Sequence, residues 1–448
     1  MSGAVTDLLG SVLERAAGRG ATAADAFLVE ARHFSATVRL GEVDTVAHAR
    51  DQRLSLRVFS GRASAAASTS DLSPAALERV IDEATRLARV TAEDPCAGLP
   101  DSGELIGTLP DLDLHDGGGH DLGPEDKIEI ARRAEGAALG FDARVTNSDG
   151  AEYWDRQARY AYATSAGFAA DYTTSGFGLS VAPIAVRDGE MQRDAWYSMA
   201  RKRARLDAPE AVGRVAAERT LRRLGARKVR TTEVPVVFDT ETAASLVRSI
   251  AAAAAGPSLY RRASFLCDRL GSRIAAPTVT IVDDGTIPGA LGSRPFDGEG
   301  LPTRRTVIVR DGMLESYLLD SYSARKLGLT STHHGGRDGS GMTVVPTNLM
   351  LLPGPATPEE LIASVPSGLY VTELIGFGVN GVTGDYSRGA AGLWIENGRL
   401  TYPVEEITIA GNLLAMLMAI EGIGNDLVLR DRTASPTVKI GRMVVAGN

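Results

Sequence analysis

The chain has 448 residues, a net charge of −8, 44% apolar and 23% charged residues, and only two cysteines. At roughly 150 residues a domain, this length predicts two or three domains with the composition of a soluble globular protein. The acidic balance disfavours a non-specific nucleic-acid binder, which usually presents a basic face, so we expect no nucleic-acid partner. Cys96 and Cys267 lie outside any CxxC pair, so the sequence predicts neither a metal knuckle nor a disulfide framework.

The sequence also disfavours a membrane or secreted location. No uncharged apolar run approaches the ~18 residues that a membrane-spanning helix needs. Residues 1–20 contain Asp7 and Glu14 and lack the basic segment of a secretion signal. We therefore expect a cytoplasmic protein without a membrane partner.

Residues 1–118 are predicted to form an N-terminal α+β domain. Strand 53–59 alternates apolar and polar residues, which indicates one buried face, and Ser73-Pro74 has the N-cap and first-turn pattern of a helix start. Residues 96–123 are rich in Pro, Asp and Gly and are predicted to be a linker or a long surface loop. The expected elements are a helix over 4–18, strands Ala26–Glu30, Ser35–Leu40 and Arg53–Phe59, and a helix carrying Leu77, Val80, Ile81, Ala84 and Leu87.

Residues 119–228 are predicted to form a central domain. A helix should run from Pro124 to about Leu139, and strands rich in Tyr, Thr, Val and Ala should follow as far as Ile184. An amphipathic helix from Pro209 to Leu224 should end this domain.

Residues 229–448 are predicted to form a C-terminal domain rich in antiparallel strands. Asp311-Gly312 and Asn397-Gly398 are each flanked by strand-like runs and favour type I′ hairpin turns. Thr357 fits a capping box, and Asn412 fits the N-cap of a helix carrying Leu413, Leu414, Leu417 and Ile420. The remaining expected strands are Val234–Phe238, Thr306–Val309, Leu314–Leu319, Leu393–Ile395, Leu400–Tyr402 and Thr437–Val445. The whole chain is therefore predicted to be α+β, a mixed α/β unit followed by this antiparallel domain.

One glycine pattern resembles a nucleotide-binding motif. Residues 376–381 spell GxGxxG after an apparent strand, Leu369–Ile375. In a dinucleotide fold the third glycine opens a helix, but Val382–Ser387 does not have the pattern of a helix start. We interpret the glycines as a turn in which backbone approaches backbone.

The six histidines provide no recognisable metal motif. None lies in HExxH, HxxEH or HExxxH, and the adjacent pair His333-His334 cannot easily chelate one ion, because neighbouring side chains on an extended chain point in opposite directions. We interpret this pair as part of a mobile polar loop near a binding surface. His115 and His120 fall in the predicted linker and are expected to be exposed to solvent.

The most chemically varied stretch is Asn380–Trp394, where glycines and hydroxyl side chains surround Asp385 and Arg388. Such a loop can offer bare backbone to an extended peptide as an added strand, or it can be a structural crossover that needs small residues. We expect Asp385 and Arg388 to pair and fix its shape. The substrate-groove candidates are Asn380, Thr383, Gly384, Asp385, Tyr386, Ser387, Arg388 and Gly389.

At these residues the chain resembles the TldD/PmbA family, and specifically its TldE (PmbA) branch. The similarity covers nearly all of the chain and is strongest from about residue 205 onwards. It is carried by the segments Arg261–Leu266, Pro295–Gly300, Ser321–Leu329, Thr383–Gly392 and Pro403–Asn412.

The resemblance implies that this chain has no zinc site of its own. The catalytic TldD branch carries HExxxH on a helix just before the segment that matches Arg261–Leu266. The matching positions here, give or take one residue, are Val247, Arg248 and Ala252, and 245–255 contains no His, Cys, Asp or Glu. None of these side chains can ligate zinc or act as its general base. Residues 426–436 also lack the late cysteine of the TldD branch.

The resemblance therefore implies a non-catalytic, metal-free subunit, inactive alone, of a heteromeric zinc metallopeptidase. Zinc is expected in a TldD-like partner, where it would activate water and polarise the scissile carbonyl, and the complex would cleave unfolded or small, including modified, peptides. We expect a heterodimer with that partner, or a homodimer when the chain is alone. Two alternatives stay open: a stand-alone homodimeric peptide-binding protein, and a biosynthetic hydrolase subunit that acts on a small peptide-like intermediate.

Overall fold

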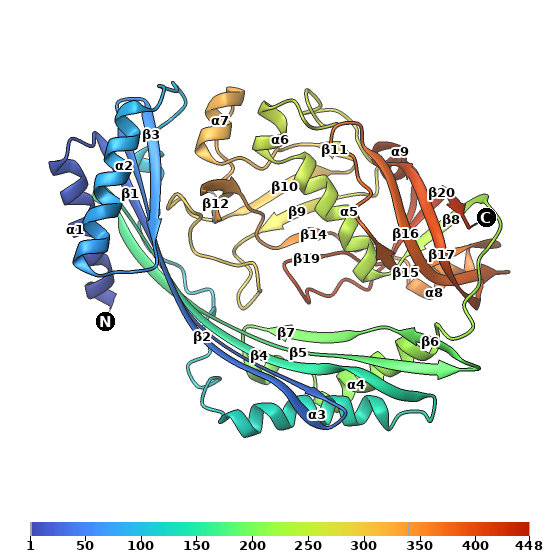
Figure 1. Cartoon of the computed structure of the whole chain (residues 1–448). Helices are drawn as coiled ribbons and strands as arrows, with labels where there is room; N and C mark the ends of the chain where they lie inside the picture. The colour runs from blue at the N-terminus through green and yellow to red at the C-terminus, as the bar shows by residue number, and fades with distance from the viewer. Residues whose placement is uncertain (1, 339–340, 448) are drawn as a thin grey trace.

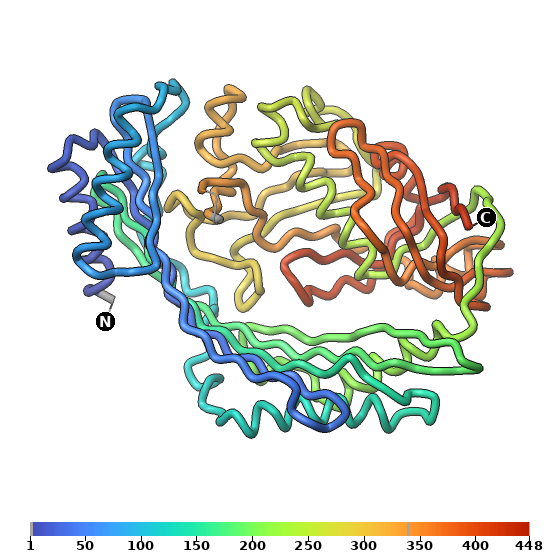
Figure 2. Tube along the Cα trace, in the orientation of Figure 1, coloured from blue at the N-terminus to red at the C-terminus, as the bar shows by residue number. Residues whose placement is uncertain are grey.

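A computed structural model describes residues 2–338 and 341–447. Its largest layer is a seven-stranded antiparallel sheet in the order β3-β2-β1-β4-β5-β6, with β7 also paired to β5. Strands β1, β2, β4 and β5 are long, and they bend so that the sheet runs along one side of the C-terminal unit and beneath it (Figures 1 and 2). The strands are β1 (Ala23–Arg39), β2 (Glu42–Ser60), β3 (Ala63–Thr69), β4 (Val145–Thr164), β5 (Ala169–Arg187), β6 (Glu190–Arg193) and β7 (Trp196–Ala200).

Two helix pairs cover the convex face of this sheet (Figure 1). Helices α1 (Ser2–Gly18) and α2 (Pro74–Val90) pack near one end, and α3 (Pro124–Leu139) and α4 (Pro209–Leu221) near the other. Because strand side chains alternate between faces, the even-numbered residues of β1 point to the helices. Leu28 belongs to the core under α1 and α2, whereas Phe34 and Ala36 belong to the core under α3 and α4.

The concave face of the sheet packs against the C-terminal unit through a buried charge network. Asp25 on β1 has no exposed surface and pairs with Arg57 on β2. The same carboxylate pairs with Arg337 of the C-terminal unit, with 2.9 Å between Asp25 Oδ2 and Arg337 Nη2. Tyr162 on β4 donates its hydroxyl to this oxygen at 3.2 Å. A buried carboxylate needs such partners to offset its desolvation, so the network fixes how the two layers meet.

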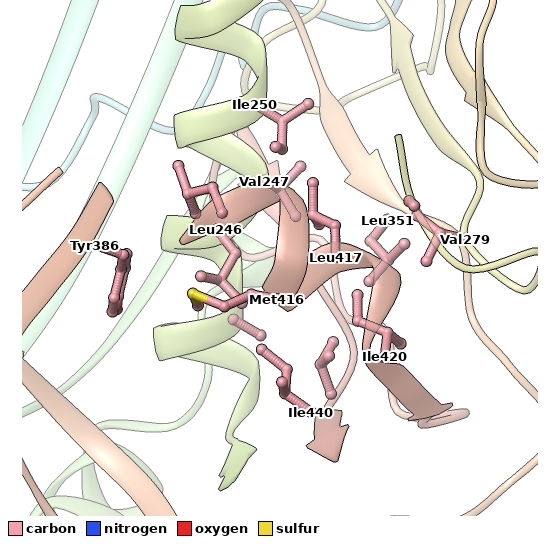
Figure 3. Close-up of a cluster of buried hydrophobic side chains, with 14 of the residues drawn as sticks. Leu246, Val247, Ile250, Val279, Leu351, Tyr386, Met416, Leu417, Ile420 and Ile440 are labelled. Carbon is pink, nitrogen blue, oxygen red and sulfur yellow. The ribbon is translucent and has the colours of Figure 1, made fainter. Parts of the chain in front are cut away.

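The C-terminal unit holds the main hydrophobic core between two sheets. A six-stranded sheet has the order β17-β16-β15-β8-β20-β18, and a five-stranded sheet has the order β11-β10-β9-β14-β19. Helix α5 (Thr240–Ala253) packs against strands of both, and Figure 3 shows its apolar face meeting Met416, Leu417 and Ile440. The first sheet comprises β8 (Thr232–Phe238), β15 (Ser367–Ile375), β16 (Asp385–Glu396), β17 (Arg399–Asn412), β18 (Ile420–Ile423) and β20 (Val438–Ala446).

The remaining elements are short. They are β9 (Ile281–Asp284), β10 (Arg305–Arg310), β11 (Met313–Leu314), β14 (Leu349–Leu351), β19 (Thr433–Ala434), the hairpin β12 (Gly335–Asp338) and β13 (Gly341–Val344), and helices α6 (Gly256–Tyr260), α7 (Ser321–Leu327), α8 (Pro358–Ala363) and α9 (Leu413–Met418). Single 3₁₀ turns occur at Ser102–Glu104 and Arg203–Arg205. The α+β fold class with an antiparallel-rich C-terminal unit is confirmed.

The local turn and cap predictions are confirmed where side chains satisfy backbone groups. Asp311-Gly312 and Asn397-Gly398 have positive φ at both residues, as type I′ turns require. Ser73, Thr357 and Asn412 each accept a backbone N–H at the start of a helix.

Strand lengths were predicted less well. The two strands Ala26–Glu30 and Ser35–Leu40 are one strand, β1, because its partners β2 and β4 pair with it along nearly its whole length. The expected strand Leu314–Leu319 is only β11, two residues long, and Ile420 lies in β18 rather than in the helix after Asn412. The domain boundary at residue 118 stays a prediction, although residues on both sides of it form one continuous sheet.

Residues 96–123 lack strands and long helices, as predicted, but they are not a loose linker. Leu112 and Leu114 are buried, and Ser175 on β5 donates its N–H to the Leu114 carbonyl at 2.9 Å. Across the described residues, no helix is both long enough and apolar enough to cross a membrane.

Candidate functional site

Helix α5 occupies the place where the family resemblance puts a zinc helix. Asp239 caps it by accepting the Thr242 N–H at 2.9 Å. Val247 is buried in the core beside Leu246 and Ile250 (Figure 3), whereas Arg248 and Ala252, one turn apart, are exposed. The helix therefore uses this stretch for packing and presents an arginine and an alanine to solvent.

The side chains around α5 do not fit a zinc ion. A protein zinc site needs three or four thiolate, imidazole or carboxylate ligands. Within residues 2–338 and 341–447 no group of three or more His, Cys, Asp or Glu side chains could hold a metal ion. We therefore derive no chemical step through a metal in this chain.

The groove candidates from Asp385 to Gly389 lie on a strand, whereas Asn380, Thr383 and Gly384 lie in the loop before it. Residues 385–396 form β16, which pairs with β17 along one edge and, from Gly389 onwards, with β15 along the other. Nearer its start, Ser387 donates its N–H to the Gly378 carbonyl at 2.7 Å. The backbone of 385–389 is thus occupied on both sides, and the expectation that it binds a peptide as an added strand is wrong. That the side chains of the candidate residues line a substrate groove stays a prediction.

The true loop is 376–384, and polar contacts fix its base. Asn380 Oδ1 accepts the Val382 N–H at 2.9 Å, and the Thr383 hydroxyl donates to Asp385 Oδ2 at 2.6 Å. Asn412 donates its side-chain amide to the Thr383 carbonyl at 3.0 Å and to Asp385 Oδ1 at 3.2 Å. The hydrogen bonds from Thr383 and then Asn412 lower the pKa of Asp385. The network joins the ends of β16 and β17.

Asp385 and Arg388 do not pair, contrary to expectation. Residues three apart on a strand point to opposite faces. Asp385 is exposed and bound by Thr383 and Asn412, while Arg388 is half-buried and donates to the Leu374 carbonyl at 3.4 Å. Tyr386 points into the hydrophobic core and is only 2% exposed, so this groove candidate is not open to a substrate.

The GxGxxG glycines serve a backbone contact, as interpreted from the sequence. A Cβ atom at Gly378 would lie 1.5 Å from the Ser387 carbonyl oxygen, so only glycine fits there. Gly376 has a positive φ of 76°. No helix follows the third glycine, because 385–396 is the strand β16.

The same loop carries apolar side chains into solvent. Phe377, Val379 and Val382 on the loop are exposed, as is Ile375 at the end of β15, and Phe377 is fully exposed. Exposed apolar side chains gathered on one segment are typical of a contact with another chain. Sequence reasoning missed this feature because the run Ile375–Val382 looks like an ordinary strand end followed by a turn.

Two buried acids, Asp297 and Glu299, lie where segments 295–300 and 321–329 of the family resemblance meet. Asp297 accepts N–H donors from Glu299, Leu301 and Gly335, and Glu299 accepts the Ser321 N–H at the start of α7 at 2.8 Å. Burial, and next the neighbouring Asp297, raise the pKa of Glu299 to about 7. Both carboxyl groups are nearly inaccessible to solvent, so they tie segments together and do not face a substrate.

The expectations for three histidines are wrong. His334 is 2% exposed and lies 3.0 Å from Asp283 Oδ2, so it belongs to a buried network and not to a mobile loop. His333 lies 2.7 Å from the Pro302 carbonyl oxygen and is half-buried. His120 contacts Asp155 at 3.1 Å, whereas His115 is exposed as predicted. Contacts with residues distant in the sequence bury these rings, and the local sequence does not indicate those contacts.

Comparison with known families agrees with this geometry. Residues 231–447 match the PmbA/TldA metallopeptidase C-terminal domain, 119–224 match its central domain and 24–88 match domain 1. A protein named metalloprotease PmbA from Escherichia coli O157:H7 is 40% identical over 98% of this chain and 96% of its own. The fold and these matches define a protein of the metallopeptidase type.

The chain belongs to the TldD/PmbA family, in its PmbA/TldE branch. A solved protein from Bacteroides thetaiotaomicron, described as a candidate modulator of DNA gyrase, is 29% identical, with a TM-score of 0.91 over 99% of this chain and 98% of that one. TldE from Thermococcus kodakarensis is 19% identical, and its TM-score of 0.88 over 98% of this chain and 100% of that chain shows the shared fold.

Proposed function

We propose that this chain is the non-catalytic subunit of a heteromeric zinc metallopeptidase that cleaves unfolded or small peptides. The observation that carries the proposal is the contrast between similarity to a metalloprotease over nearly the full length and the absence of His, Cys, Asp and Glu from 245–255, where the zinc motif is expected. Such a chain can contribute binding surface and architecture, but Val247, Arg248 and Ala252 supply no group to activate water.

The reactive centre of the proposed complex lies in a TldD-like partner. There an HExxxH helix would hold zinc, which supplies Lewis-acid chemistry and an activated water. This chain would contribute its apolar loop 376–384 to the contact with that partner, and the concave junction between its two layers to peptide binding.

Co-expression with a TldD-like chain tests the proposal. We expect the two chains to purify together with zinc, and the complex to cleave an unfolded protein such as casein. Replacing the glutamate of the partner's HExxxH by alanine should abolish cleavage without separating the chains. This chain alone should hold no stoichiometric zinc and cleave nothing.

Three results would contradict the proposal. Cleavage by the isolated chain would make it an enzyme in its own right. A partnered, zinc-loaded complex that cleaves no polypeptide but converts a small peptide-like intermediate would favour the biosynthetic alternative. A homodimer that ignores the TldD-like chain would favour the stand-alone binding protein.

A further inference from the structure

A cavity of about 240 Å³ lies where the concave face of the seven-stranded sheet meets the C-terminal unit. Strands β1, β4 and β5 form one wall, and residues 291–298, 336–337 and 345–346 form the other. A second cavity of about 160 Å³ adjoins it and shares Arg156, Thr174, Arg201, Leu291 and Arg432. We call the two together the arginine cavity.

Four of its arginines have no carboxylate partner. Within the described residues, no Asp or Glu oxygen lies within 4.0 Å of the guanidinium nitrogens of Arg156, Arg201, Arg294 or Arg432, whereas the chain's other cavity arginine, Arg337, pairs with Asp25. Most arginines that are taken out of water find an acid. Here Arg156, Arg201 and Arg294 are half-buried without one among the described residues, and the exposed Arg432 lines the same cavity.

Each half-buried arginine is held in place by neutral groups. Arg201 donates to the carbonyls of Ser175 at 3.0 Å and Leu291 at 2.5 Å, and Arg156 donates to the Tyr160 hydroxyl at 3.1 Å. Arg294 donates to the Val345 carbonyl at 2.9 Å, and among the described residues its buried Nε has no hydrogen-bond partner. These contacts position the guanidinium groups and leave their charge unneutralised.

Two acids, Asp297 and Asp431, also line the arginine cavity, but within the described residues neither lies within 4.0 Å of the four guanidinium groups. Asp297 accepts three backbone N–H donors, and Asp431 accepts the N–H of Arg432 at 2.7 Å through Oδ1. Burial, and next the proximity of Arg432, lower the pKa of Arg201 to about 10. A lowered pKa at an arginine agrees with a site that carries uncompensated positive charge.

Aromatic rings give the cavity a rigid apolar wall. Tyr160 and Tyr172 stack with ring centroids 5.2 Å apart, and Phe296 meets Tyr172 edge-on at 5.1 Å. Aromatic rings beside convergent charged groups in a preformed cavity are typical of a small-ligand site. The ligand that fits is compact, anionic and partly apolar.

We propose that the arginine cavity binds a carboxylate of a peptide. Guanidinium groups donate paired hydrogen bonds that match the two oxygens of a carboxylate, and the aromatic wall suits the adjoining side chain. The choice of a peptide over other anions rests on the proposed function. The carboxylate is either the chain terminus or an acidic side chain.

Calorimetric titration of the purified full-length chain tests this inference. The probes are acetyl-trialanine with a free C-terminus, the same peptide as its amide, and acetyl-Ala-Glu-Ala-amide. We expect the free acid or the glutamate peptide to bind and the trialanine amide not to bind. The preferred acid then identifies the source of the carboxylate, and binding should weaken as salt is raised.

Arg156→Gln and Arg432→Gln should each weaken binding by about tenfold or more, as expected for the loss of a charged hydrogen bond. Arg430→Gln is the matched control, because Arg430 stacks over Trp196 and lies outside the arginine cavity. Circular dichroism and the midpoint of thermal unfolding should be similar for all three variants.

The inference is overturned if no acid peptide binds, if the amide binds as well as the acid, or if inorganic phosphate binds more tightly than either acid peptide. It is also overturned if Arg430→Gln weakens binding as much as the cavity variants do. The assay needs neither partner nor zinc. If the chain binds the carboxylate but the complex cleaves no peptide, only the proposed function is contradicted. If the complex cleaves peptides but the chain binds no carboxylate, only this inference is contradicted.

Discussion

At the scale of a single residue, Glu299 couples stability to pH. Its carboxyl is buried beside Asp297, and its pKa is raised from 4.5 to about 7. Between these values the folded state keeps a proton that the unfolded chain has lost. The free energy of unfolding should therefore fall as pH rises through this window, and the contribution is fully present only below about pH 4.5.

Glu299→Gln should remove that dependence, because the amide oxygen can still accept the Ser321 N–H and carries no charge. We expect the variant to unfold at a higher temperature than the parent chain at pH 8 and at a similar temperature at pH 5. Thermal unfolding followed at both pH values measures this. A loss of stability at pH 8 would show that the ionised carboxylate is favourable.

At the scale of an element, the turn between β15 and β16 depends on one glycine. A Cβ atom at Gly378 would overlap the Ser387 carbonyl oxygen, whereas a Cβ atom at Gly381 would meet nothing closer than 3.8 Å. We expect Gly378→Ala to lower the free energy of unfolding by about 1–3 kcal/mol, the usual cost of overpacking. Gly381→Ala is the control and should change it little. Urea denaturation of the two variants compares them directly, and equal effects would refute the argument.

At the scale of the whole molecule, the exposed loop 376–384 bears on assembly. We expect the chain to form a dimer, with itself or with a TldD-like chain, and the apolar side chains around Phe377 to lie in the contact. Phe377→Ser should then shift the chain towards monomer. Met191→Ser is the control, since Met191 on β6 is an exposed apolar residue 71% accessible and far from this loop in sequence.

Light scattering at micromolar concentration measures the outcome with and without the partner. A parent chain that is monomeric in both conditions would contradict the assembly prediction. If the parent chain is a dimer and Phe377→Ser leaves it intact, the contact lies on another surface.

Much of the local structure follows from the sequence because short-range chemistry decides it. Asn397-Gly398 can adopt the two positive φ angles of its turn, and Thr357 has a glutamate three residues later to complete its capping box. The absence of ligands at Val247, Arg248 and Ala252 is also a property of the sequence alone. These features need no knowledge of distant residues.

The tertiary structure alone decided the rest, because long-range pairing and burial set it. Residues 385–389 follow the glycines of a loop, yet β17 on one side and contacts with Gly378 and β15 on the other make them part of a sheet. His334 lies in a Gly-rich segment and is buried by contact with Asp283. Arg156, Arg201, Arg294 and Arg432 are far apart along the chain, and they line one cavity only because the curved sheet folds against the C-terminal unit.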